Sequence, residues 1–143
     1  MSRSDEGIER LKFRKTIFEK LIMQRELLPG IKQFDLSGKV AIVTGGSKGL
    51  GFAMAAGLAS AGANIMLVNR NVDQGIEAAQ ALTTDYGIQA IAFGADICDI
   101  KQTETMVNMA VNTFGKIDIL INSAGINIRG AIDEVTPEDF TKV

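Results

Sequence analysis

Residues 39–51 read KVAIVTGGSKGLG, an apolar strand pattern that runs directly into a glycine-rich loop and then into an alanine-rich helix at 50–61. Gly45 lets the chain leave the strand in a tight turn, Gly49 removes the Cβ that would block a pyrophosphate, and Gly51 lets helix and strand pack closely. The N–H groups and the dipole at the start of the helix then face an anion. Because the glycines stand between a strand and a helix, the stretch predicts a phosphate-binding loop.

The same alternation of short apolar strands and helical stretches continues along the chain. We expect strands at 39–44, 64–68, 88–93 and 117–121, helices at 50–61, 72–86 and 100–114, and a fourth helix that opens at Pro137 behind the cap Thr136. Strands without hydrophobic and polar alternation, each followed by a helix, are covered on both faces, as in a parallel sheet with right-handed crossovers. The predicted fold class is therefore α/β, a doubly wound parallel sheet of the Rossmann type. Ile76, Ala79 and Leu82 are expected on the buried stripe of their helix.

Length and composition fit one globular domain at 35–143, preceded by an extension at 1–34. The extension is dense in basic and acidic residues, and we expect a partly amphipathic helix that ends at Pro29. It lacks the apolar core of a secretory signal, and its acidic residues argue against a mitochondrial presequence. It is either a solvated extension that packs loosely on the domain or an arm that contacts another subunit.

Charge and residue content exclude several function classes. The formal net charge of −2 and the pI near 5.2 give no support to a nucleic-acid or anionic-membrane partner. A single cysteine and the absence of histidine exclude an internal disulfide, the usual zinc ligand sets and a Ser-His-Asp triad. Cys98 is expected to be a small buried apolar residue. No apolar run approaches the roughly 20 residues of a membrane span, so we expect a cytoplasmic protein.

The residues around the loop separate the possible phosphate ligands. A P-loop needs a lysine and a hydroxyl after its last glycine, but the sequence after Gly49 reads LGF. A methyltransferase-like cofactor would want an acidic residue at the end of the second strand, which instead reads Asn69 and Arg70. An acid there would select NAD through the ribose 2′-hydroxyl, whereas an arginine accepts the 2′-phosphate of NADP. With Lys48 adding positive charge, NADP(H) is favoured over NAD(H); the alternative is that Lys48 and Arg70 are ordinary surface charges.

Three motifs in order resemble those of the short-chain dehydrogenases/reductases. TGGSKGLG at 44–51 resembles the family's TGxxxGxG loop, and NSAG at 122–125 stands where the family carries NNAG. Asp96 and Ile97 follow the third strand, where the family carries an Asp-Val or Asp-Ile pair beside the adenine. The resemblance covers 35–143 and is to the compact, single-domain branch; Ser123 departs from the second Asn of the family motif.

The resemblance assigns roles to these residues. It implies that Ser47, Lys48 and Leu50 line the path of the phosphates and ribose, that Asp96 and Ile97 border the adenine, and that Asn122, Ala124 and Gly125 flank the nicotinamide ribose. Together with the glycines and the end of the second strand, the predicted cofactor-binding set is Gly45, Ser47, Lys48, Gly49, Leu50, Gly51, Asn69, Arg70, Asp96, Ile97, Asn122, Ala124 and Gly125. Asp96 is alternatively a turn or capping residue, and Asn122 a structural strand-end amide.

The family's proton-transfer pair, Tyr-x-x-x-Lys on a helix, has no match here. Tyr86 is the only tyrosine, and Ala90 stands four residues later. We therefore expect an incomplete copy with four of seven strands, whose strand at 117–121 leaves an apolar edge in solvent, so that the chain is marginally stable and prone to associate.

The function that the resemblance implies is that of an NADP(H)-dependent oxidoreductase. It would interconvert a secondary alcohol and a ketone of sugar-acid, polyol or 3-oxoacyl type, with a small carbonyl or alcohol compound as substrate. The full-length enzyme is expected to be a homo-oligomer, and this chain alone is expected to be inactive. The alternative is a non-catalytic NADP(H)-binding or partner module.

Overall fold

The computed structural model describes residues 30–128, 130, 133 and 135–142, and the chain divides into two units, 1–34 and 35–143. The described part of the first unit contains one short 3-10 helix, η1 (Ile31–Phe34). The helix expected in the rest of the extension lies outside the described residues.

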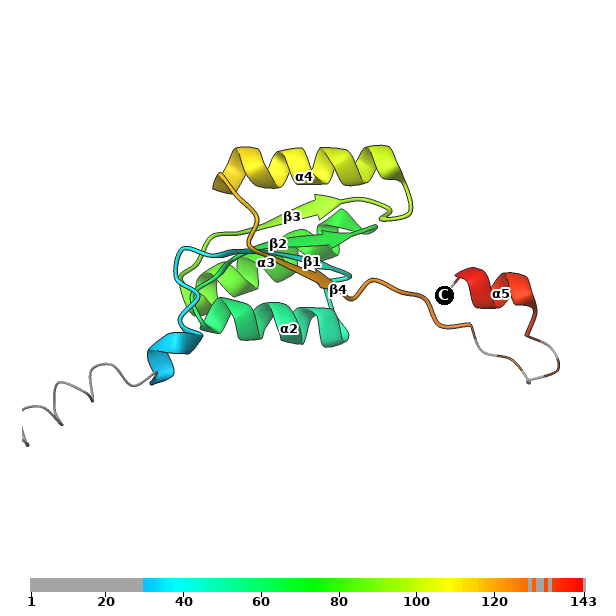
Figure 1. Cartoon of the computed structure of the whole chain (residues 1–143), viewed down its shortest axis with the longest axis horizontal. Helices are drawn as coiled ribbons and strands as arrows, with labels where there is room; N and C mark the ends of the chain where they lie inside the picture. Colours follow the sequence, from blue (N-terminus) through cyan, green and yellow to red (C-terminus); the bar gives the residue numbers. More distant parts are fainter. Residues whose placement is uncertain (1–29, 129, 131–132, 134, 143) are drawn as a thin grey trace, which may run out of the picture. The chain divides into compact units, whose positions relative to one another are not determined.

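The second unit contains a four-stranded parallel sheet with strand order β3-β2-β1-β4. The strands are β1 (Val40–Thr44), β2 (Asn64–Asn69), β3 (Ala90–Gly94) and β4 (Ile119–Asn122), and the helices are α2 (Gly49–Ser60), α3 (Val72–Tyr86), α4 (Ile100–Phe114) and α5 (Pro137–Lys142). Figure 1 shows α4 on one side of the sheet and α2 and α3 on the other. The predicted α/β fold with a doubly wound parallel sheet is confirmed.

The core has two layers because alternate residues of the central strands face opposite helices. One layer joins α2 and α3 to the sheet through Ala41, Val43, Ala55, Ala59, Ala63, Ile65, Leu67, Ala78, Ala79 and Leu82. The other layer joins α4 to the sheet through Ile42, Met66, Val68, Ala95, Met106 and Ala110. All five residues of β1 are buried, as the continuous apolar run predicted.

Two predictions of burial are wrong. Ile76 is 52 % exposed, because α3 packs on the sheet through the small residues Gly75, Ala78 and Ala79, together with Leu82, and Ile76 lies outside this stripe. Cys98 is exposed, because it lies in the turn between β3 and α4, where its N–H donates to Asp96 Oδ1 at 3.0 Å. Its apolar character therefore does not place it in the core.

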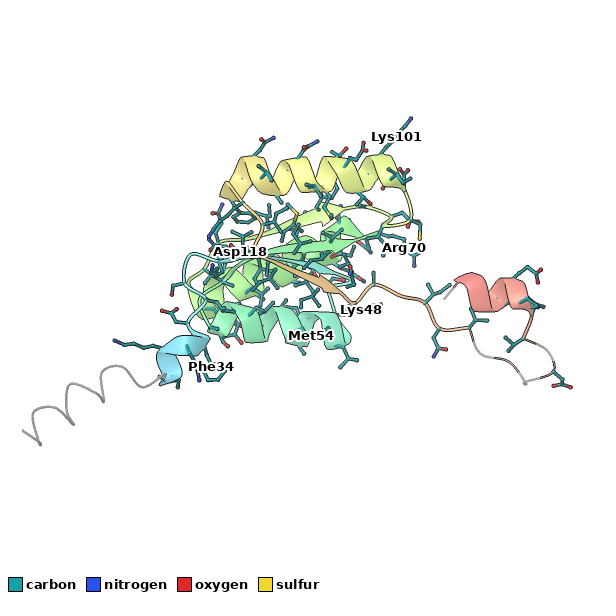
Figure 2. The ribbon with its side chains drawn as sticks, in the orientation of Figure 1. Phe34, Lys48, Met54, Arg70, Lys101 and Asp118 are labelled. Carbon is teal, nitrogen blue, oxygen red and sulfur yellow. The ribbon has the colours of Figure 1, made fainter. Side chains whose placement is uncertain are left out.

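The start of β4 is fixed to the start of β1 by a single carboxylate. Asp118 accepts a hydrogen bond from the Val40 N–H at 2.9 Å and forms ion pairs with Lys116 at 3.1 Å and Lys39 at 3.2 Å. Partial desolvation raises the pKa of Asp118, but the bonds from Lys116, Val40 and Lys39 outweigh it, and the net pKa is below the ordinary value of 3.8. This contact lies at the end of the sheet opposite to the glycine loop (Figure 2).

Among the described residues, β4 is an edge strand that pairs with β1 alone. Leu120 lies on the face covered elsewhere by α4 and is 54 % exposed. The described residues include no helix with the length and apolar content needed to cross a membrane.

Candidate functional site

The glycine loop makes a corner that leaves no room for a side chain at Gly45 or at Gly51. Gly45 has φ +65°, and a Cβ placed on it would lie 2.8 Å from Ala124 Cα. A Cβ on Gly51 would lie 2.3 Å from the carbonyl oxygen of Gly45. The loop is therefore folded against itself and against the segment after β4, and this contact brings the start of α2 to the carboxyl ends of β1 and β4.

The N-terminus of α2 is open, and no side chain that the structure describes caps it. Lys48 is the N-cap residue and makes no side-chain cap hydrogen bond, and the first turn contains no acidic residue. By contrast, Asn71 caps α3 and Asp99 caps α4. Leu50 is 81 % exposed, and no atom of residues that the structure describes lies within 4 Å of a Cβ placed on Gly49. Peptide N–H groups at a helix start that is exposed and lacks an acidic cap fit a phosphate group.

Thr44 ties the segment after β4 to the glycine loop. Its side chain is buried, and its Oγ1 donates to the Ile121 carbonyl at 3.3 Å while accepting from the Ser123 and Ala124 N–H groups, each at 3.1 Å. Thr44 is the first residue of the glycine-loop motif, but the motif by itself assigns it no role. A hydroxyl residue at the end of an otherwise apolar, fully buried strand was the available signal.

The topology gathers the other predicted residues at the same edge of the sheet. The chain leaves β1 through α2 toward β2 and returns through α4 to β4, so the direction of winding changes between β1 and β4. Ligands of doubly wound sheets bind at such a switch, outside the carboxyl ends of the strands. Each predicted group lies at the carboxyl end of a strand or directly after it: the loop at 45–51, Asn69 with Arg70, Asp96 with Ile97, and residues 122–125. Figure 2 shows Lys48 and Arg70 at this end and Asp118 at the other.

The two predicted cations are exposed at this edge. Neither Lys48 nor Arg70 forms an ion pair with any residue that the structure describes. Asn69 precedes Arg70 at the end of β2, and its Nδ2 donates to the Asn71 carbonyl. Its Oδ1 is buried, and no group in the described part of the chain bonds to it. The amide of Asn69 is thus engaged with the turn that follows β2.

The segment after β3 combines a turn with an exposed apolar side chain. Asp96 Oδ1 accepts from the Cys98 N–H at 3.0 Å, and the Asp96 N–H donates to Gln102 Oε1 at 2.9 Å. This is the turn role that was the alternative for Asp96. Ile97 is 39 % exposed and remains open for contact with a ligand.

The connection from β4 to α5 is described in part. Residues 129, 131, 132 and 134 lie outside the described part of the chain. Thr136 Oγ1 accepts from the Asp139 N–H at 3.1 Å, so Thr136 caps α5 as predicted. Asn122 and Gly125 are both exposed, and no atom of the described residues lies within 4 Å of a Cβ placed on Gly125.

Comparison with known proteins gives one matching family. Residues 39–143 match the family model described as short chain dehydrogenase. An uncharacterized oxidoreductase of Methylorubrum extorquens is 40 % identical over 108 residues, which are 76 % of this chain and 44 % of the relative. Versicolorin reductase 1 of Dothistroma septosporum is 36 % identical over 114 residues, covering 79 % of this chain and 43 % of the relative.

Solved structures give the same match. L-sorbose reductase from Gluconobacter frateurii, complexed with NADPH and L-sorbose, superposes with a TM-score of 0.67 at 38 % identity, over 73 % of this chain and 40 % of that chain. An alcohol dehydrogenase from the archaeon Thermococcus sibiricus, complexed with 5-hydroxy-NADP, has a TM-score of 0.66 at 29 % identity, over 72 % and 44 %. The chain spans less than half the length of the relatives that it matches.

Proposed function

Because this chain belongs to the short-chain dehydrogenase/reductase family, we propose that it binds NADP(H) and is the cofactor-binding part of an oxidoreductase that interconverts a secondary alcohol and a ketone. The observation that carries the proposal is the closed corner of Gly45, Gly51 and Ala124 at the exposed start of α2. A corner without side chains permits the close approach that a pyrophosphate needs, and the helix start offers N–H donors.

The loop residues take the phosphates in this proposal. Backbone N–H groups between Gly45 and Gly51 donate to the pyrophosphate, with Ser47 and Leu50 along its path. Lys48 and Arg70 are exposed, without ion-pair partners among the described residues, and are available for the 2′-phosphate. An arginine binds such a group through two parallel hydrogen bonds.

The remaining predicted residues hold the two nucleosides. Ile97 contacts the adenine next to the turn of Asp96, and Asn122, Ala124 and Gly125 flank the ribose of the nicotinamide. When bound, the nicotinamide ring supplies the hydride acceptor or donor. The chain contributes position and charge complementarity: Thr44 keeps the segment after β4 against the glycine loop, so that both halves of the cofactor meet one rigid edge.

The substrate class is a sugar acid, polyol or 3-oxoacyl compound. The likeness to an L-sorbose reductase complexed with NADPH and L-sorbose supports a hydroxylated substrate and NADP(H). Since the sequence contains no Tyr-x-x-x-Lys pair, we propose that this chain alone binds the cofactor without turnover. Separately, we propose that the full-length enzyme is a homo-oligomer. The same missing pair favours a second candidate function, a non-catalytic NADP(H)-binding module.

A fluorescence titration with NADPH and NADH tests the proposal. We expect saturable binding of both, tighter for NADPH, and a selective loss of NADPH affinity in Arg70→Asp because its carboxylate repels the 2′-phosphate. Unchanged NADPH affinity in Arg70→Asp would refute the coenzyme preference. Absence of binding for both nucleotides would refute the function. Assaying the chain for ketone reduction with NADPH then separates the enzyme from the binding module.

A further inference from the structure

The turn between β2 and α3 is held by side-chain hydrogen bonds on both sides of Arg70. Before it, Asn69 Nδ2 donates to the Asn71 carbonyl. After it, Asn71 Oδ1 accepts from the Gln74 N–H at 3.3 Å and caps α3. Arg70 itself is exposed and has no ion-pair partner among the described residues. The hydrogen bonds of Asn69 and Asn71 therefore determine the position of the Arg70 backbone.

Gly75 supplies the space that the Asn69 amide occupies. A Cβ placed on Gly75 would lie 2.7 Å from Asn69 Nδ2, 3.1 Å from Asn69 Oδ1 and 3.0 Å from the Cβ of Ala92 on β3. Asn69 Oδ1 is buried and has no hydrogen-bond partner among the described residues, an arrangement that costs stability. The Asn69 amide therefore lies against α3 at a cost in stability. The interaction that it makes there is the hydrogen bond to the Asn71 carbonyl.

We propose that Asn69 and Gly75 are positioning residues that set the preference for NADP(H) over NAD(H) by fixing the turn that carries Arg70. This inference rests on the proposed function, in which Arg70 binds the 2′-phosphate. Recognition by a guanidinium group through two parallel hydrogen bonds depends on its orientation. A displaced turn therefore weakens the contact with the 2′-phosphate, while the pyrophosphate contacts of the glycine loop, which is built on β1 and α2, stay in place.

Two substitutions and one matched control test the inference in the full 143-residue chain. Gly75→Ala places a methyl group where the Asn69 amide lies, and Asn69→Ala removes the amide. Gly57→Ala is the control, because Gly57 is also a helical glycine but has nothing within 4 Å of a Cβ. The measured quantity is the ratio of the dissociation constants for NADH and NADPH, from fluorescence titrations, with unfolding followed by circular dichroism.

We expect Gly75→Ala and Asn69→Ala to lower this ratio by about tenfold, the scale of one hydrogen bond to a charged group. Gly57→Ala leaves the ratio unchanged. In an Arg70→Ala background, Asn69→Ala has no further effect on the ratio, because it acts through Arg70.

The titrations have several possible outcomes, and each supports or overturns the inference. If the wild type has a ratio above one and both variants keep that ratio, the inference is overturned and the proposed function stands. The same holds if the variants lose affinity for both nucleotides equally. An effect of Asn69→Ala that persists without Arg70 assigns Asn69 a direct contact and overturns the positioning role. If the wild type binds neither nucleotide, or binds both alike, the proposed NADP(H) function fails and the inference with it. If Gly75→Ala does not fold, Asn69→Ala decides alone.

Discussion

Replacing Thr44 by valine removes one hydroxyl group and keeps the shape of the side chain. The hydroxyl makes three hydrogen bonds, to the Ile121 carbonyl and to the N–H groups of Ser123 and Ala124. These bonds hold the segment after β4 against the glycine loop. Thr44→Val is therefore expected to loosen the part of the site that we assign to the nicotinamide ribose.

The size of the effect follows from the three bonds. Each hydrogen bond between neutral groups contributes about 0.5–1.5 kcal/mol net, and the methyl group that replaces the hydroxyl returns about 0.8 kcal/mol of apolar burial. Three bonds less the methyl group give a drop in the free energy of unfolding of about 1–4 kcal/mol for Thr44→Val. If binding must supply about 1.4 kcal/mol to hold the loosened segment in place, NADPH binding weakens about tenfold.

Urea unfolding followed by circular dichroism and a fluorescence titration with NADPH measure the two effects. Thr44→Ser is the matched control, because it keeps the hydroxyl and loses only a methyl group, whose burial contributes about 0.8 kcal/mol. We expect Thr44→Ser to bind NADPH like the wild type. If Thr44→Val binds NADPH as tightly as Thr44→Ser does, the hydroxyl does not position the site.

Three further predictions concern other parts of the unit. Gly51→Ala puts a methyl group 2.3 Å from the carbonyl oxygen of Gly45, and it should destabilise the chain by about 1–3 kcal/mol and abolish NADPH binding. The control Gly57→Ala should instead raise the urea midpoint, because alanine has the higher helix propensity. The folded pKa of Asp118 is below the ordinary value of 3.8, so its contribution to folding stability is present above pH 3.8 and is lost as the pH falls through the folded pKa. Between pH 6 and about pH 2.5, the urea midpoint should therefore drop more for the wild type than for Asp118→Asn. Leu120→Lys on the exposed edge strand should shift the chain toward monomer in sedimentation velocity, and equal association of both proteins would show that the β4 edge is not the contact.

The order and type of the elements were predictable because burial on both faces leaves a clear pattern in sequence. The helices α3 and α4 begin and end where they were expected. The third and fourth strands begin two residues later than expected, at Ala90 and Ile119. Ile88 and Ile117 contact the core without joining the ladder, so apolar character marked burial and not strand pairing.

The positions of the site residues along the sheet were also predictable, because parallel strands bring their carboxyl ends to one edge. The contacts between loops were not. Thr44 bonds to residues 79 and 80 positions away, and Gly45 contacts Ala124, and such contacts depend on which strands are neighbours. The bond from the Asn69 amide to the Asn71 carbonyl was likewise not predictable, because the sequence gives no sign that Gly75 leaves space for the amide.

The pairing of β1 with β4 determines whether this site forms at all. Four register pairs run from Ala41 with Ile119 to Thr44 with Asn122, a short ladder at an edge of the described sheet. A slip by one residue would turn every side chain of β4 to the opposite face and separate the Thr44 hydroxyl from its N–H partners. Asp118 opposes such a slip at one end of the ladder through the Val40 N–H, and Thr44 opposes it at the other. A substitution at Asp118 should therefore weaken NADPH binding at the far end of the strands, because the register that it fixes places residues 122–125 beside the glycine loop.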